Sequence, residues 1–295
     1  METAQLIVVL SLSVAVLWGL ADFWAARASK ITGPVTTALG VNAVSLLFMV
    51  LLYVAVPQHP AQASGQGIAW AMAGGAIISV AMILLYKGFA HGPVSLVSPI
   101  GSAYPVVMTL LALTIFHGRL SSGQLLAIAA IVLGIMAAAG LFTVRRSERH
   151  MSKGPTLAVA SAIVYGVGFT CMAQASIHIG WELASLLQCV GGTAIFAILL
   201  PLARGAEAPL RGLWRTLTNG FVAGAAITGI AAMCALNLAF SKDPSAGAIA
   251  GAISACYPVI TVLLALKHFK EEPKPIPLAG ATLAVAGVVA LSLIS

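Results

Sequence analysis

Long apolar runs, separated by proline, glycine and charged residues, divide the chain into segments of similar length. A membrane core of about 30 Å is crossed by roughly 20 apolar residues of helix, because each residue advances the helix by about 1.5 Å. Ten segments reach that length, and we expect a transmembrane helix in each: residues 5–26, 34–56, 67–88, 93–116, 123–143, 155–178, 182–203, 217–240, 245–268 and 276–294. The pattern predicts an all-α integral membrane protein with short connections.

A stretch in the fourth segment recurs in the ninth. YPVVMTLLAL at 104–113 returns as YPVITVLLAL at 257–266, with seven of the ten positions identical and a spacing of 153 residues. At the same spacing Gly134 aligns with Gly287. A weaker similarity pairs WGLADFWAARAS, from residue 18, with YGVGFTCMAQAS, from residue 165. The two halves of the chain are therefore copies of one unit.

Each copy holds five helices, and this odd number determines how the copies are related. The second copy enters the membrane from the opposite side, so a pseudo-two-fold axis in the membrane plane relates the halves. We expect two inverted five-helix repeats, 1–144 and 155–295, joined by a basic loop at 145–154. Inverted repeats of this kind are typical of alternating-access transporters.

Composition agrees with a membrane protein. Of 295 residues, 60% are hydrophobic and 8% are charged, against roughly 25% charged in soluble domains. The net charge of +7 comes from single cations and small groups between apolar runs, which is the pattern of membrane-flanking charge and not of a nucleic-acid surface. The four cysteines lie in apolar segments without metal-ligand spacing, so we expect buried small side chains, no metal site and no disulfide.

The distribution of positive charge predicts an orientation, because Lys and Arg in short loops stay on the cytoplasmic side. Thirteen of these residues lie in the odd-numbered connections: Arg27, Lys30, Lys87, Arg145, Arg146, Arg149, Lys153, Arg204, Arg211, Arg215, Lys267, Lys270 and Lys274. The even-numbered connections carry only Arg119 and Lys242. We therefore expect both termini outside and the 145–154 loop in the cytoplasm.

Three stretches resemble the EamA-type members of the drug/metabolite transporter superfamily: LWG at 17–19, SLVSPIGSAYPVVMTLLAL at 95–113 and HGRLSSGQLLAIAAIVLGI at 117–135. The resemblance covers essentially the whole chain in two copies. It implies a ten-helix carrier for small metabolites, often an exporter of amino acids, with a central cavity between the halves. It also implies internal termini, which the charge count contradicts.

The chain departs from the family pattern at one turn. Members commonly carry a Glu in a GER-like turn after the fourth helix, and here that position is Gly118, whereas the second copy keeps Glu271.

Asp22 is the only acidic residue well inside a predicted span. An ionised Asp at the centre of a membrane helix costs about 2.5–3.5 kcal/mol on insertion scales, so we expect such a residue to have a binding partner that offsets this cost. It would serve either as a counter-charge for a substrate amine or a proton site, or as an interfacial partner of Arg27 or Lys30.

Proline and small polar residues mark the fourth and ninth helices. Proline leaves backbone carbonyls without donors, and lipid tolerates this only where protein or a wet cavity covers them. We expect both helices to line the cavity, the alternative being kinks that only improve helix packing; the residues concerned are Ser98, Pro99, Ser102, Tyr104, Pro105, Ser254, Tyr257 and Pro258.

Aromatic and amide side chains complete the candidate substrate site. Trp18, Tyr165 and Phe169 fall on the first and sixth helices, which are equivalent in the two halves, and could stack on a planar ligand. The amides are Asn42, Gln188 and Asn237, and each could contact substrate or join two helices by hydrogen bonds.

These features favour a secondary transporter over other classes. The chain lacks HExxH, GxSxG and P-loop motifs, and its two aspartates are in different halves, so we do not expect an enzyme or a cofactor. A channel or facilitative pore is the alternative. We expect an exporter of small organic metabolites, most of all amino acids including aromatic ones, acting as a monomer in the cell (inner) membrane without a nucleic-acid partner.

Overall fold

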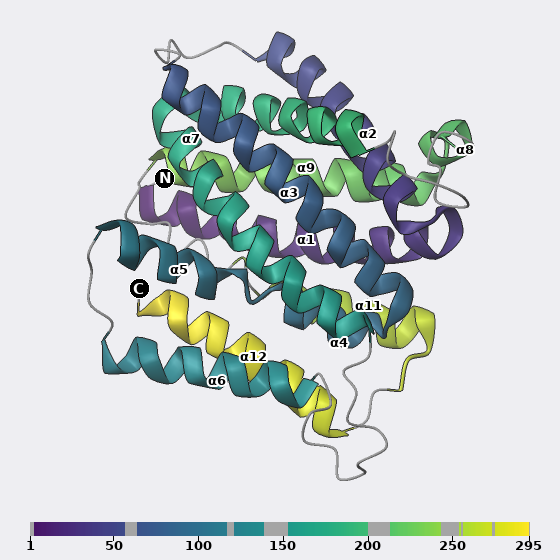
Figure 1. Ribbon diagram of the computed structural model, residues 1–295, viewed down its shortest axis with the longest axis vertical. Coiled ribbons are helices and arrows are strands. Elements are labelled where there is room, and N and C mark those ends of the chain that lie inside the picture. Colours follow the sequence, from purple (N-terminus) through teal and green to yellow (C-terminus); the bar gives the residue numbers. More distant parts are fainter. Residues whose placement is uncertain are drawn as a thin grey trace.

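The computed structural model describes residues 3–56, 64–116, 121–138, 153–199, 213–242, 254, 256–272 and 275–294. Every element in these ranges is a helix (Figure 1): α1 Thr3–Thr32, α2 Pro34–Ala55, α3 Gly65–His91, α4 Val94–Gly101, α5 Tyr104–Phe116, α6 Ser122–Ala138, α7 Lys153–Leu199, α8 Leu213–Leu217, α9 Gly220–Lys242, α11 Tyr257–Phe269 and α12 Pro275–Leu293. Six helical stretches of the described chain are long and apolar enough to cross a membrane. The predicted all-α membrane fold is confirmed.

The fourth segment, predicted as one helix over 93–116, is broken into α4 and α5. Ser102 and Ala103 lie between the two helices. Pro99 and Pro105 have no N–H to donate to the carbonyls one turn earlier, so the helical hydrogen bonding fails on both sides of the break. At the break the N–H of Ala103 donates to the carbonyl of Ile100 at 3.2 Å, and the hydroxyl of Ser102 donates to the carbonyl of Pro99 at 2.8 Å in its place.

The sixth and seventh segments, predicted over 155–178 and 182–203, run without interruption through α7. The chain reverses at Gly180, whose φ of 76° lies in the left-handed region that glycine adopts without a steric penalty. The two arms of α7 are the two predicted spans. Of the segment predicted over 245–268, the part before α11 lies outside the described residues apart from Ser254 and Cys256.

Equivalent glycines make equivalent helix contacts in the two halves. A methyl group on Gly19 in α1 would lie 2.9 Å from the carbonyl oxygen of Tyr257 in α11. A methyl group on Gly166 in α7 would lie 2.8 Å from the carbonyl oxygen of Tyr104 in α5. Gly19 and Gly166 are matched positions of the repeat, as are Tyr104 and Tyr257, so one contact occurs twice with the halves exchanged.

The helices α6 and α12, which lie side by side in Figure 1, pack about the symmetry axis itself. Gly134 of α6 lies against the carbonyl of Gly280, and Gly287 of α12 lies against the carbonyl of Ala127. Positions 134 and 287 are 153 residues apart, and so are 127 and 280, so each helix offers the other the same surface. The repeat limits themselves, 1–144 and 155–295, stay predictions.

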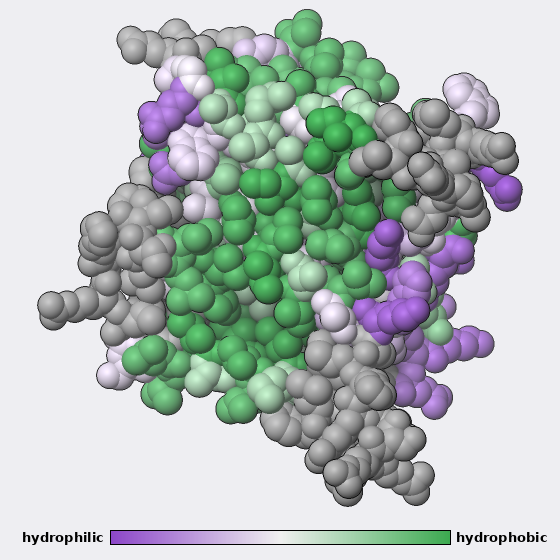
Figure 2. All heavy atoms as spheres, viewed as in Figure 1, coloured by the Kyte–Doolittle hydropathy of each residue, from purple (hydrophilic) through white to green (hydrophobic). Residues whose placement is uncertain are grey.

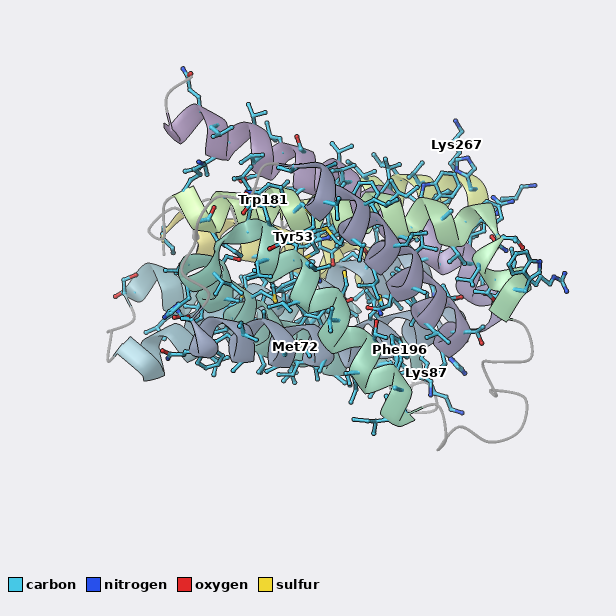
Figure 3. The ribbon with its side chains drawn as sticks, turned by 90° about the horizontal axis from the view of Figure 1, so that it is seen from above. Tyr53, Met72, Lys87, Trp181, Phe196 and Lys267 are labelled. Atoms are coloured by element: carbon cyan, nitrogen blue, oxygen red, sulfur yellow. The ribbon has the colours of Figure 1, made fainter. Side chains whose placement is uncertain are left out.

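The outer surface is apolar over its middle and basic at one end. Large hydrophobic side chains such as Leu51, Val54 and Leu126 are exposed, and Figure 2 shows a continuous apolar face with a larger group of hydrophilic residues at its right margin and a smaller group at its upper left. Figure 3 places Lys87 and Lys267 toward one end of the bundle and Trp181 toward the other. We call the end where α1, α3 and α11 finish and α4 begins the basic end.

Candidate substrate cavity

A cavity of about 120 Å³ lies between α1, α2, α3, α7 and α9, with the first residues of α5 and α11 at its wall. A single water needs roughly 10–15 Å³ on this measure, so the cavity has room for several waters or a small organic group. Eight of the residues expected at the site line it: Trp18, Asp22, Asn42, Tyr104, Tyr165, Phe169, Gln188 and Tyr257. Sequence positions from both repeats thus converge on one space.

Asp22 faces this cavity from α1 and is held by α4. The hydroxyl of Ser98, which is fully buried, donates a 2.7 Å hydrogen bond to Oδ2 of Asp22. The cations proposed as interfacial partners lie elsewhere: Arg27 sits 4.8 Å from the ring centroid of Phe221, and Lys30 sits 4.3 Å from that of Phe269. In the described chain the carboxylate is therefore directed to the cavity and not to an ion pair.

Five aromatic rings at the cavity wall contact one another around Trp18. Tyr104 and Tyr257, the matched tyrosines of the two repeats, each form a T-shaped contact with Trp18, with centroid distances of 6.2 and 5.8 Å. Phe169 lies 5.5 Å from Trp18 and is stacked on Tyr165 at 5.3 Å. The cluster is a continuous aromatic surface contributed by α1, α5, α7 and α11.

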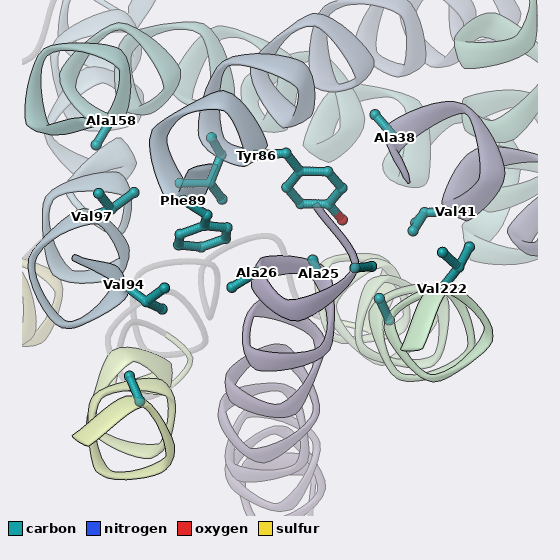
Figure 4. Packing of buried hydrophobic residues seen from close by; sticks show 14 of the residues in the cluster. Ala25, Ala26, Ala38, Val41, Tyr86, Phe89, Val94, Val97, Ala158 and Val222 are labelled. Atoms are coloured by element: carbon teal, nitrogen blue, oxygen red, sulfur yellow. The ribbon is translucent and has the colours of Figure 1, made fainter. Parts of the chain in front are cut away.

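A sixth ring, Tyr86 of α3, also lines the cavity and was missed by the sequence analysis. Figure 4 shows its ring directed toward the space between Ala25, Ala38 and Val41, where small side chains leave room for it. Tyr86 stands in a segment without proline or a repeat partner of the same type, so its sequence context carries no signal of a site.

Two amides take part in different ways. Asn42 of α2 uses its Nδ2 to reach the second arm of α7, donating to Oγ1 of Thr193 at 2.9 Å and to the carbonyl of Cys189 at 3.4 Å. Gln188 is only 8% exposed, and its Oε1 has no hydrogen-bond partner within the described residues. Asn42 therefore both lines the cavity and joins two helices, whereas Gln188 leaves an acceptor open.

Other expected site residues lie outside the lining. Ser98, Ser102 and Ser254 are all buried, and Ser98 donates to the lining residue Asp22. Asn237 donates to Oγ of Ser185 at 2.8 Å and so joins α9 to α7.

The prolines act on backbone geometry. Pro99 interrupts α4 from inside, while Pro105 and Pro258 are the second residues of α5 and α11. Proline is favourable in a first helical turn, where its missing N–H would have no partner. Each proline directly follows the first residue of its helix. These first residues, Tyr104 and Tyr257, line the cavity.

The remaining residues of the cavity wall were not predicted from the sequence. This part of the wall is formed by small or apolar residues of α1, α2, α3 and α9, together with Cys189 of α7, and no polar pattern distinguishes them in sequence: Ala21, Val41, Ser45, Ile78, Ser79, Met82, Leu85, Ala225, Gly229, Ile230 and Met233. Of the cysteines, Cys171, Cys189 and Cys234 are buried as expected, whereas Cys256 is half-buried.

At the basic end, Glu271 joins the two repeats. Its Oε1 and Oε2 accept hydrogen bonds from the backbone N–H groups of Val94 and Ser95, at 2.8 and 2.9 Å, at the start of α4. The preceding residue, Lys270, has a φ of 53°, the left-handed conformation that lets the chain turn after α11. A carboxylate at a helix N-terminus both satisfies free N–H groups and complements the helix dipole.

The comparisons with known proteins bear on this architecture. A solved crystal structure of another protein is similar over 98% of this chain and 96% of that chain, with a TM-score of 0.61 and 15% sequence identity, which supports the fold alone. A comparison with curated protein sequences finds no match. The sequence model of the EamA-like transporter family matches residues 5–139 and again 152–293, one match for each repeat. The chain belongs to the EamA-like transporter family.

Proposed function

We propose that this protein is a secondary transporter that exports small organic metabolites, most of all amino acids including aromatic ones, by alternating access. The observation that carries the proposal is the position of the cavity: both repeats contribute to its wall, and its one described charge, Asp22, faces the enclosed space. Membership of the EamA-like family supports a membrane transporter of small solutes. The amino-acid class and the outward direction are our inference.

The symmetry of the halves supplies the mechanism. Because the halves make the same contacts with their roles exchanged, rocking one against the other can open the cavity first to one side of the membrane and then to the other. Glu271 belongs to the second repeat and accepts hydrogen bonds from the first turn of α4 in the first repeat, so a contact between the halves lies at the basic end. Opening at that end requires this contact to loosen.

The lining supports a substrate with an amino group and an apolar side chain. In this proposal the carboxylate of Asp22, oriented by Ser98, binds the ammonium group. Trp18, Phe169 and Tyr257 pack against the side chain, because aromatic faces and edges pack well against other rings.

We further propose that the protein resides in the inner membrane, with its termini outside and the basic end in the cytoplasm. Lys87 and Lys267 lie toward one end of the bundle in Figure 3, and Lys270 precedes Glu271, which binds the start of α4; these positions support the orientation. One chain contains both halves and the cavity between them, which supports transport by a monomer.

Counterflow into proteoliposomes tests the function. Vesicles loaded with unlabelled L-phenylalanine should take up labelled L-phenylalanine transiently above equilibrium, and saturably, with and without a pH gradient. A channel, the alternative, would give linear flux without this overshoot. Vesicles that show no counterflow with L-phenylalanine or L-threonine, in protein shown to be folded, would contradict the amino-acid assignment.

A further inference from the structure

The described residues of the cavity wall carry negative charge and no positive charge. Asp22 is the only charged side chain among the described residues that line the cavity. Arg27 and Lys30, the next cations along α1, lie against the rings of Phe221 and Phe269. A positive group in the cavity therefore meets a carboxylate, whereas a negative group meets no described cation.

The neutral polar groups of the wall favour the same kind of ligand. Gln188 is buried and lines the cavity, and its Oε1 has no partner within the described chain. Asn42, in contrast, already uses its Nδ2 on Cys189 and Thr193. Because a buried acceptor without a donor is unfavourable, a ligand that brings N–H donors gains by filling it.

The aromatic surface suits both parts of an organic ammonium ion. The faces of aromatic rings attract cations, and more strongly where water is excluded. Trp18, Tyr86, Tyr104, Tyr165, Phe169 and Tyr257 all lie at the wall that also carries Asp22. The same rings pack an apolar group attached to the ammonium.

We propose that the cavity selects protonated primary amines with an aromatic or compact apolar group, and that it binds the amine more tightly than the amino acid with the same side chain. The proposal goes beyond the amino-acid assignment, and it rests on the proposed transport function for the meaning of the site. The ammonium group binds Asp22 and the open acceptor of Gln188. The additional carboxylate of an amino acid loses its hydration without gaining a charged partner, and that loss weakens its binding.

Three ligands that share a phenyl ring and differ in charge test this directly. The probes are 2-phenylethylamine (a cation), L-phenylalanine (a zwitterion) and 3-phenylpropionate (an anion), titrated into purified protein at neutral pH by calorimetry. We expect saturable binding of 2-phenylethylamine at least tenfold tighter than that of L-phenylalanine, and no measurable binding of 3-phenylpropionate. L-Phenylalanine binding as tightly as the amine, or an absence of amine binding, would overturn the proposal.

Variants then locate the site. Asp22→Asn should weaken binding of 2-phenylethylamine at least tenfold, whereas Glu272→Gln, which removes the charge of an exposed carboxylate outside the cavity lining, should leave it unchanged. Gln188→Leu should weaken amine binding about threefold or more, and it provides a second test if Asp22→Asn does not give monodisperse protein. Unchanged amine affinity in a folded Asp22→Asn variant would overturn the assignment.

Failure of the selectivity and failure of the transport function have different signatures. If 2-phenylethylamine binds selectively and no ligand undergoes counterflow, the selectivity stands and the transport function is wrong. If L-phenylalanine undergoes counterflow and binds as tightly as the amine, the transport function stands and the selectivity is wrong.

Discussion

Glu271 accepts a 2.8 Å hydrogen bond from the backbone N–H of Val94, and so fastens the turn after α11 to the first residue of α4. The two residues belong to opposite repeats. At the position that corresponds to Glu271, the first repeat has Gly118, which has no side chain to accept such a bond and lies outside the described residues. The sequence therefore encodes this carboxylate once and not twice, so the two ends of the transporter are not equivalent.

Replacing Glu271 by Gln should lower the thermal stability of the purified protein. The neutral amide offers one acceptor in place of two charged oxygens, and a carboxylate at a helix N-terminus contributes about 1 kcal/mol. Glu272→Gln is the matched control, because Glu272 is its exposed neighbour and undergoes the same chemical change. Equal unfolding temperatures for the two variants would show that the contact with α4 adds nothing to stability.

Gly75→Ala should destabilise the protein by about 1–3 kcal/mol, although alanine favours helix by roughly 1 kcal/mol over glycine. A methyl group on Gly75 would overlap the backbone carbonyl of Gln188, where α3 and α7 pack closely. Gly65→Ala is the control, because nothing lies within 4 Å of that position. Thermal unfolding of both variants measures the difference, and a Gly75→Ala protein as stable as the control would contradict the close packing.

Trp18→Leu should reduce the preference for ring-bearing substrates at least tenfold in counterflow, measured as uptake of L-phenylalanine relative to L-threonine. Trp18 contacts three other rings at the cavity wall, and leucine cannot replace these contacts. Trp24→Leu changes the same residue type on the same helix outside the cavity, where Trp24 stacks on Phe221 at 5.6 Å. If both variants shift the substrate ratio equally, the aromatic surface of the cavity does not set specificity.

Cysteine labelling should distinguish the two ends of the bundle. Gln66 and Glu272 are both exposed, Gln66 at the start of α3 and Glu272 beyond the end of α11. In a background without the native cysteines, a membrane-impermeant maleimide should label Gln66→Cys in intact cells and Glu272→Cys only after lysis. The opposite labelling pattern would place the termini inside and refute the orientation drawn from charge.

Much of the fold was predictable because its signals are local or repeated. Apolar segments of membrane-spanning length follow from the need to satisfy backbone hydrogen bonds inside lipid, and they were found to within a few residues where the structure describes them. The spacing of 153 residues that relates Gly134 to Gly287 also predicted which helices are equivalent. The break between α4 and α5 was expected only as a kink, because a proline signal does not tell how far the helix is interrupted.

The candidate site was predictable only in part, for a physical reason. Asp22, Tyr104 and Phe169 were noticed because a charge or an aromatic ring in a membrane segment is conspicuous by its type. Tyr86 lines the same cavity, and Asn237 joins α9 to α7 through its hydrogen bond to Ser185. Such positions depend on how each helix is rotated and how the helices cross, and the order of residues along the chain does not give this information.

The sequence by itself determined the membrane class, the ten spans and the two repeats, since each depends on composition, segment length or internal similarity. Only the tertiary structure decided that Asp22 faces the cavity with Ser98 as its donor, and that Glu271 closes α4. Both contacts join residues at least 76 positions apart in the chain. Such pairs form only when the packing of whole helices brings them together, and that packing depends on every close contact in the bundle.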